Sequence, residues 1–317
     1  MAQTREFTFP SSDGDHQVHA VEWLPDAGAP RAVVQLVHGI SEYIGRYDGF
    51  ARCLTDHGFA VVGHDHLGHG GTARGREEYG FLGERDGWAH LVADVHALHR
   101  LAADRFPGLP CFLLGHSMGS FVARTYLIDH PGALSGCILS GTGQESGALV
   151  GFGKGLCGLL AAVKGPNTVS KLVTGLTLGP YNKKFAPNRT PSDWISRDEA
   201  VVDAYCADPL CRFVPTLGMN RDMMGGLQYI ARRENLRKMD PDTPIYFFSG
   251  DADPVGQEGK GVQKVAGWFR DAGVKDVTVK LYPGGRHEML NEVNKLEVYS
   301  DTLAWLEGVL AKIPATV

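Results

Sequence analysis

A serine stands where the sequence pattern predicts a sharp turn between a strand and a helix. Ser117 lies in Gly115-His116-Ser117-Met118-Gly119, directly after the apolar run Cys111–Leu114. A serine hydroxyl is a poor nucleophile, so an enzyme that uses one holds it exposed on such a turn, beside a base and amide donors. The flanking glycines permit this turn. We therefore predict that Ser117 is a nucleophile, an interpretation that depends on finding its partners.

An aspartate and a histidine in two later loops fit these partner roles. His287 follows an apolar run, and imidazole titrates near neutral pH, so this side chain is expected to take the Ser117 proton and return it to the leaving group. Asp253 is expected to fix the His287 tautomer. Asp251 is the competing candidate, but it directly follows Gly250 at the strand exit, whereas Asp253 lies further out. Capping of the next helix is the structural alternative for either carboxylate.

Two backbone amides are predicted to stabilise a tetrahedral intermediate. One is the N–H of Met118, which follows the nucleophile. The other is the N–H of Ile40, in the loop His38-Gly39-Ile40-Ser41-Glu42, where Gly39 permits a close backbone approach. His38 itself is interpreted as structural.

Other histidines could in principle bind a metal ion, but their spacing does not match a known metal site. His64, His66 and His69, with Asp65, lie in a glycine-rich turn without a recognised ligand spacing. The segment 287–291 begins like a zinc-protease helix but has Asn291 where the second histidine ligand belongs. We expect no metal and no cofactor.

Short apolar runs alternate with helical patterns along most of the chain. This alternation predicts a doubly wound α/β sheet. Mixed polar and apolar segments at 5–9 and 17–23 predict an antiparallel hairpin at the sheet edge. The expected core strands are 32–37, 59–62, 111–114, 137–139, 245–248 and 277–281, and the expected helices are 47–57, 88–106, 120–130, 259–272 and 289–311.

One connection is far too long for a simple crossover. About 100 residues separate the strand ending near Ser140 from the strand that begins after Pro244, so an inserted cap is expected. The predicted organisation is a core of residues 1–142 and 241–317 with a cap of residues 143–240. Within the cap, residues 148–163 predict a helix with one apolar face, weakened by four glycines. It is either a mobile lid or a helix buried against the core, and it is too short and too charged at Lys154 for a membrane span.

The composition and charge argue against a protein that binds nucleic acid or anionic membranes. The 317 residues are 43% hydrophobic and carry a net charge of −5, with no basic cluster to attract nucleic acid or an anionic membrane. No signal peptide is recognised at the N-terminus, which predicts a cytoplasmic location and reduced cysteines, although a bridge between Cys206 and Cys211 is conceivable.

Taken together, these motifs resemble the monoacylglycerol lipase and lysophospholipase branch of the α/β-hydrolase family, also grouped with serine aminopeptidase-like hydrolases. The resemblance covers most of the chain and rests on His38 to Glu42 with Arg46-Tyr47, Asp65 with Gly68-His69-Gly70, Gly115 to Gly119, Gly250 with Asp253-Pro254, and His287-Glu288 with Asn291-Glu292. It implies a triad of Ser117, Asp253 and His287, oxyanion amides at Ile40 and Met118, and a mainly helical cap between the sixth and seventh strands of an eight-stranded sheet. Tyr43 and His66 depart from the residues common in that branch, His and Arg respectively.

The function expected from this resemblance is hydrolysis of carboxylic esters with a single acyl chain, such as monoacylglycerols, through an acyl-enzyme. Alternatives are a short-chain or aromatic monoester hydrolase, a lysophospholipase, an aminopeptidase, an acyltransferase, or a binding protein that keeps the hydrolase fold. The expected partner is a small ester. Transient membrane or micelle contact through the cap and a homodimer are left open.

Overall fold

One eight-stranded sheet forms the centre of the fold. The computed structural model describes residues 3–177 and 179–313. The strands are β1 (Gln3–Pro10), β2 (Gln17–Leu24), β3 (Ala32–Val37), β4 (Phe59–His64), β5 (Cys111–His116), β6 (Gly136–Ser140), β7 (Ile245–Gly250) and β8 (Val277–Tyr282). Their order is β1-β2-β4-β3-β5-β6-β7-β8. The hairpin β1-β2 is antiparallel at one edge, β2 is antiparallel to β4, and the other neighbours are parallel, which confirms the predicted sheet.

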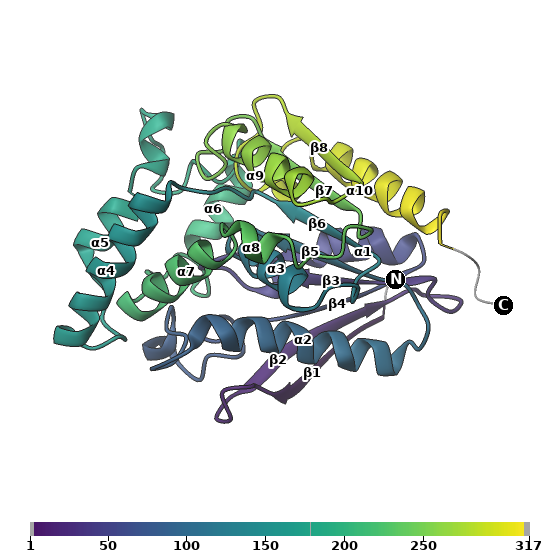
Figure 1. Cartoon of the computed structure of the whole chain (residues 1–317), viewed down its shortest axis with the longest axis horizontal. Helices are drawn as coiled ribbons and strands as arrows, with labels where there is room; N and C mark the ends of the chain where they lie inside the picture. Colours follow the sequence, from purple (N-terminus) through teal and green to yellow (C-terminus); the bar gives the residue numbers. More distant parts are fainter. Residues whose placement is uncertain (1–2, 178, 314–317) are drawn as a thin grey trace.

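Helices cover both faces of this sheet (Figure 1). On one face lie α2 (Gly87–Arg105), α3 (Met118–Asp129) and α9 (Lys260–Asp271), and on the other lie α1 (Asp48–Asp56) and α10 (Lys295–Leu310). In α2, the buried residues Leu91, Val95, Leu98 and Ala102 recur at three- and four-residue spacing, so one stripe of the helix meets the sheet. Strands β3 to β7 are almost entirely buried, as continuous apolar runs predict for parallel strands covered on two sides.

The predicted helix 289–311 is interrupted near its start. Residues Met289–Asn291 form a short 3-10 turn, and α10 begins only at Lys295. Glu292 between them is extended and fully buried, and its carboxylate accepts hydrogen bonds from the backbone N–H groups of Arg286 and Arg197. These long-range bonds outweigh the local helical pattern.

In the long connection between β6 and β7, the described residues form five helices and a 3-10 turn. They are α4 (Gly147–Lys164), α5 (Lys171–Thr177), a 3-10 turn (Tyr181–Phe185), α6 (Glu199–Ala207), α7 (Leu217–Tyr229) and α8 (Arg233–Leu236). Helix α4 packs on α7, and α4 and α5 lie at the end of the molecule furthest from β1 and α10 (Figure 1).

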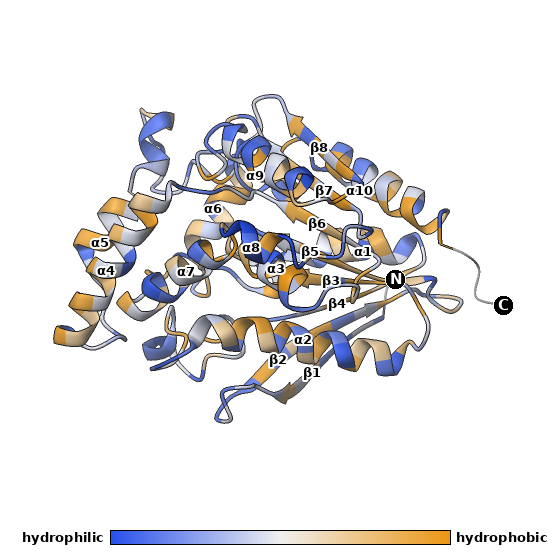
Figure 2. Cartoon of the chain, viewed as in Figure 1, coloured by the Kyte–Doolittle hydropathy of each residue, from blue (hydrophilic) through white to orange (hydrophobic). Residues whose placement is uncertain are grey.

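The apolar face predicted for α4 is exposed. Leu149, Phe152, Leu159 and Val163 are all more than half exposed, whereas the buried residues of α4 are Val150, Cys157 and Ala161. Figure 2 shows apolar residues along α4 and α5 on this outer end. Burial of this face against the core is therefore not observed. By length and composition alone α4 could cross a membrane, but one such helix is weak evidence and α4 belongs to the packed group of helices.

Candidate active site

Ser117 lies at the junction of β5 and α3 in a backbone conformation that side chains rarely adopt. Its φ is 52° and its ψ is −121°, and its N–H donates to Ser140 O at 2.9 Å, on the neighbouring strand end. The glycines on each side are required by close contacts. A Cβ at Gly119 would lie 2.1 Å from Val37 O, and one at Gly115 would lie 2.4 Å from Gly119 O. The chain thus holds the serine on a tight, strained turn.

Asp253 and His287 come together at the ends of β7 and β8. Nδ1 of His287 is 3.0 Å from both carboxylate oxygens of Asp253, and both side chains are buried. Ser249 Oγ and the Val255 N–H donate to the same carboxylate, which fixes its orientation. Burial disfavours the imidazolium, but the charge and hydrogen bond of Asp253 outweigh it, with smaller contributions from Glu288 and Glu42, so the pKa of His287 is raised above its usual 6.5.

Asp251 points elsewhere. It is exposed, and its carboxylate accepts the Gly284 N–H at 2.6 Å. The structure therefore brings Asp253, and not Asp251, to His287.

The two predicted amide donors flank Ser117. Met118 is the first residue of α3, and Ile40 lies in the loop after β3. A Cβ placed on Gly39 would lie 3.0 Å from Ser117 Cβ, so this loop passes very close to the serine. Within the described chain, neither the Ile40 nor the Met118 N–H has a hydrogen-bond acceptor. Both N–H groups are therefore available to a group bound beside Ser117.

A pocket of about 270 Å³ contains Ser117, His287 and Ile40. Glu42 and Glu288 also line it, and much of the remaining wall comes from the segment between β6 and β7, including Trp194, Ile195, Tyr205, Phe213 and Val214. Sequence reasoning did not assign these residues to the site. Their only local signal was the aromatic content of the cap, which does not reveal which ring reaches the histidine.

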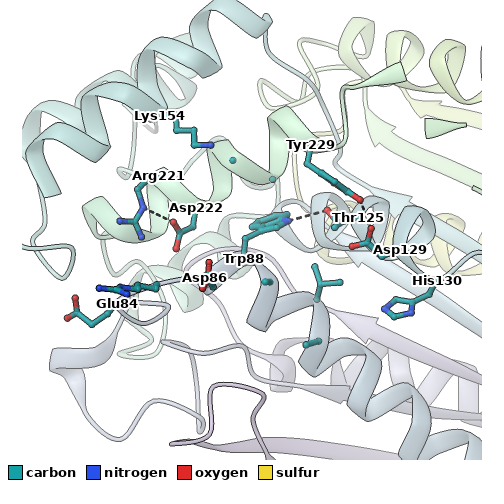
Figure 3. Close-up of a pocket in the computed structure, with 16 residues that line it drawn as sticks. Glu84, Asp86, Trp88, Thr125, Asp129, His130, Lys154, Arg221, Asp222 and Tyr229 are labelled. Atoms are coloured by element: carbon teal, nitrogen blue, oxygen red, sulfur yellow. Dashed lines mark hydrogen bonds and ion pairs between the residues drawn. The ribbon is translucent and has the colours of Figure 1, made fainter. Parts of the chain in front are cut away.

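A larger cavity of about 860 Å³ lies away from these residues. Figure 3 shows it between α2, α3 and α7, with Trp88, Arg221 and Tyr229 among its lining residues. It contains none of the predicted site residues, and several of its side chains pair with one another, as in the ion pair of Arg221 with Asp222.

The histidines near β4 form a buried cluster behind the Gly39 loop. The rings of His38 and His66 lie 4.2 Å apart, and those of His38 and His69 lie 5.2 Å apart. Burial lowers the pKa of His38 to about 3 and that of His69 to about 4, so both are neutral near pH 7. Over the described ranges, no three His, Cys, Asp or Glu side chains form a group that could hold a metal ion. All six cysteines, including Cys206 and Cys211, are free thiols.

The fold and this arrangement define an α/β-hydrolase with a serine on the turn between a strand and a helix. Residues 28–294 match the family model described as serine aminopeptidase, S33, and the chain belongs to this family.

Relatives and solved structures agree with this assignment. The chain is 32% identical over 306 residues to a monoacylglycerol lipase from Mycolicibacterium smegmatis, covering 95% of this chain and 96% of the relative. It is 28% identical to the monoglyceride lipase of Homo sapiens, covering 90% and 84% of the two chains. It superposes on a thermostable carboxyl esterase from Bacillus coagulans with a TM-score of 0.90 at 32% identity, covering 97% and 99% of the two chains.

Proposed function

We propose that this protein is a serine esterase that cleaves monoacylglycerols or similar esters with one acyl chain. The observation that carries the proposal is that Ser117 and His287 line one pocket while His287 Nδ1 lies 3.0 Å from both Asp253 oxygens. Ester hydrolysis agrees with the names of the relatives and of the esterase structure.

The proposed reaction proceeds through an acyl-enzyme. His287 Nε2 takes the Ser117 proton as Oγ attacks the ester carbonyl carbon, and the N–H groups of Ile40 and Met118 receive the oxyanion. His287 then gives this proton to the departing alcohol as the ester C–O bond breaks. A water molecule, deprotonated by the same imidazole, releases the acid and restores Ser117. Asp253 holds the tautomer of His287 that has its proton on Nδ1. No step uses a cofactor or metal.

Apolar walls support a substrate with an acyl chain. Each methylene that leaves water for such a surface contributes about 0.8 kcal/mol, so longer chains are expected to react better until the pocket ends. A preference for acetate esters would instead support the short-chain esterase alternative.

We further propose that residues 143–240 act as a cap that meets lipid surfaces. Seven of the large exposed apolar side chains belong to α4, α5 and the link between them: Leu149, Phe152, Leu159, Val163, Val169, Leu172 and Leu176. A patch of this kind is unusual on a soluble surface and suits transient contact with a micelle or membrane that contains the substrate. That the protein is cytoplasmic and that it forms a homodimer are still predictions from the sequence.

Covalent labelling tests the proposal. A serine-reactive fluorophosphonate is expected to add one adduct to the wild-type protein and to Ser300→Ala, which alters an exposed serine of α10, and none to Ser117→Ala, as read by intact mass. A folded wild-type protein without an adduct would favour a binding protein. A panel of monoacylglycerols, lysophospholipids, short-chain esters and aminoacyl amides then separates the enzyme alternatives.

A further inference from the structure

Glu42, Arg46 and Glu288 form a network of largely buried charged side chains that takes no direct part in the proposed reaction, and both glutamates line the pocket. Arg46 Nη1 is 2.8 Å from Glu42 Oε2. The same guanidinium makes two bonds to Glu288, with Nη1 to Oε1 at 2.8 Å and Nη2 to Oε2 at 2.6 Å. Both carboxylates are buried. A buried Glu–Arg–Glu arrangement is costly to desolvate, so stability alone gives a poor reason for it.

One end of this network holds the candidate oxyanion loop. Glu42 Oε1 accepts the Gly39 N–H at 2.6 Å and the Tyr47 hydroxyl at 2.9 Å. Gly39 directly precedes Ile40. On the other side of Ile40, Ser41 Oγ donates to Phe213 O at 2.7 Å. The residue whose N–H is proposed to meet the oxyanion is therefore anchored through both of its neighbours.

The other end of the network reaches the candidate base. Glu288 directly follows His287, and its N–H donates to Ile195 O at 2.7 Å. The ring of Tyr205, on α6, covers the guanidinium of Arg46 at 4.8 Å. Arg46 thus joins the Ile40 loop to the His287 loop beneath an aromatic ring from the cap.

We propose that Glu42 and Arg46 are positioning residues that fix the Ile40 N–H relative to His287 in the geometry of the tetrahedral intermediate. This inference rests on the proposed function. An oxyanion donor stabilises the transition state only when it is correctly placed beforehand, and loss of one donor costs about 10²- to 10³-fold in kcat. Displacement of the loop by about 1 Å has effects of a similar order.

The test compares two buried glutamates that pair with arginine. Glu42→Ala removes the acceptor for Gly39. Glu22→Ala is the matched control, because Glu22 on β2 is equally buried and pairs with Arg5 and Arg105, and it does not line the pocket. The substrate is a soluble p-nitrophenyl ester, and the second probe is a trifluoromethyl ketone, whose adduct with Ser117 carries an oxyanion.

Glu42→Ala is expected to lower kcat by about 10²-fold or more, with KM changed less than about 3-fold. The binding affinity for the trifluoromethyl ketone should fall by a factor similar to that for kcat. Glu42→Gln keeps an acceptor for Gly39 and should recover part of both losses. Glu22→Ala should change neither value by more than about 3-fold. Equal inhibitor affinity in Glu42→Ala and the wild type would overturn the inference.

Arg46→Lys provides the second variant if Glu42→Ala does not fold. Lysine keeps the charge but cannot bond both carboxylates as the planar guanidinium does. Both kcat and the affinity for the trifluoromethyl ketone should therefore fall at least about 10-fold. Unchanged kcat in Arg46→Lys would contradict the proposal. The two proposals fail separately: no phosphonate adduct on the wild type rejects the esterase, whereas normal labelling with wild-type kinetics in Glu42→Ala rejects only the positioning role.

Discussion

The indole of Trp194 lies against the imidazole of His287, with ring centroids 4.9 Å apart and ring planes at 34°. Trp194 O also accepts the His287 N–H at 3.4 Å, and the ring of Tyr181 packs on the indole at 5.1 Å. The histidine is therefore held by Asp253 at Nδ1 and by an aromatic side chain from the segment between β6 and β7.

Trp194→Ala should lower kcat/KM by about 2- to 13-fold, because an aromatic pair contributes about 0.5–1.5 kcal/mol beyond its buried area. Trp194→Phe keeps a ring against the imidazole and should lie closer to the wild type. Steady-state kinetics on a soluble ester provide the measurement. Identical losses in both variants would show that ring packing on His287 is not the cause.

The two aspartates after β7 should differ sharply in their effect on turnover. Asp253→Asn is expected to lower kcat by about 10⁴-fold, because an amide no longer holds the productive tautomer of His287. Asp251→Asn removes only an exposed charge and keeps an oxygen that can accept the Gly284 N–H, so it should cost far less. The measurement is the kcat of both variants, with far-UV circular dichroism to check folding. A larger loss in Asp251→Asn than in Asp253→Asn would reject Asp253 as the carboxylate that orients His287.

In the pH profile of kcat/KM, the midpoint of the acidic limb should lie above pH 6.5. The reaction needs neutral His287, and its pKa is raised above 6.5 because the charge and hydrogen bond of Asp253 outweigh burial. Activity is therefore lost as the pH falls through this raised pKa. Asp253→Asn should move the limb of its residual activity to lower pH. A wild-type limb below pH 6.5 would contradict the proposed role of Asp253.

Local patterns were sufficient to predict the sheet and the loops that hold the candidate residues. Continuous apolar runs identified the parallel strands, and the polar residues after β5, β7 and β8 identified Ser117, Asp253 and His287 as candidates. The contacts of Trp194 and Tyr205 were beyond such reasoning, because they join segments far apart in the sequence through packing that periodicity does not encode. The sequence left open whether the apolar face of α4 is buried against the core, because the pattern of one helix does not show which side its neighbour α7 covers.

The exposed apolar face of α4 should matter only for substrates at a lipid surface. Phe152→Ser with Leu159→Ser is expected to slow hydrolysis of a monoacylglycerol held in vesicles several-fold, because two large side chains no longer enter the lipid. Turnover of a soluble ester should stay within about 2-fold. Leu296→Ser, at an equally exposed leucine of α10, is the matched control. Equal effects of the α4 and α10 substitutions on vesicle hydrolysis would reject contact through α4.

The buried histidines behind the Gly39 loop should make the fold sensitive to acid. Burial lowers the pKa of His64 in the folded protein, and both ring nitrogens of His64 lack a hydrogen-bond partner among the described residues. In the unfolded chain the imidazole titrates near pH 6.5, so below that pH only the unfolded state gains the proton.

The contribution of neutral His64 to the unfolding free energy is fully present above pH 6.5. It is lost as the pH falls toward the lower pKa of the folded protein, by ~1.4 kcal/mol per pH unit for each such histidine. His64→Leu should reduce the pH dependence of the unfolding free energy by about one proton in urea titrations between about pH 5 and 7. An unaltered slope in His64→Leu would show that His64 is not neutral in the folded protein.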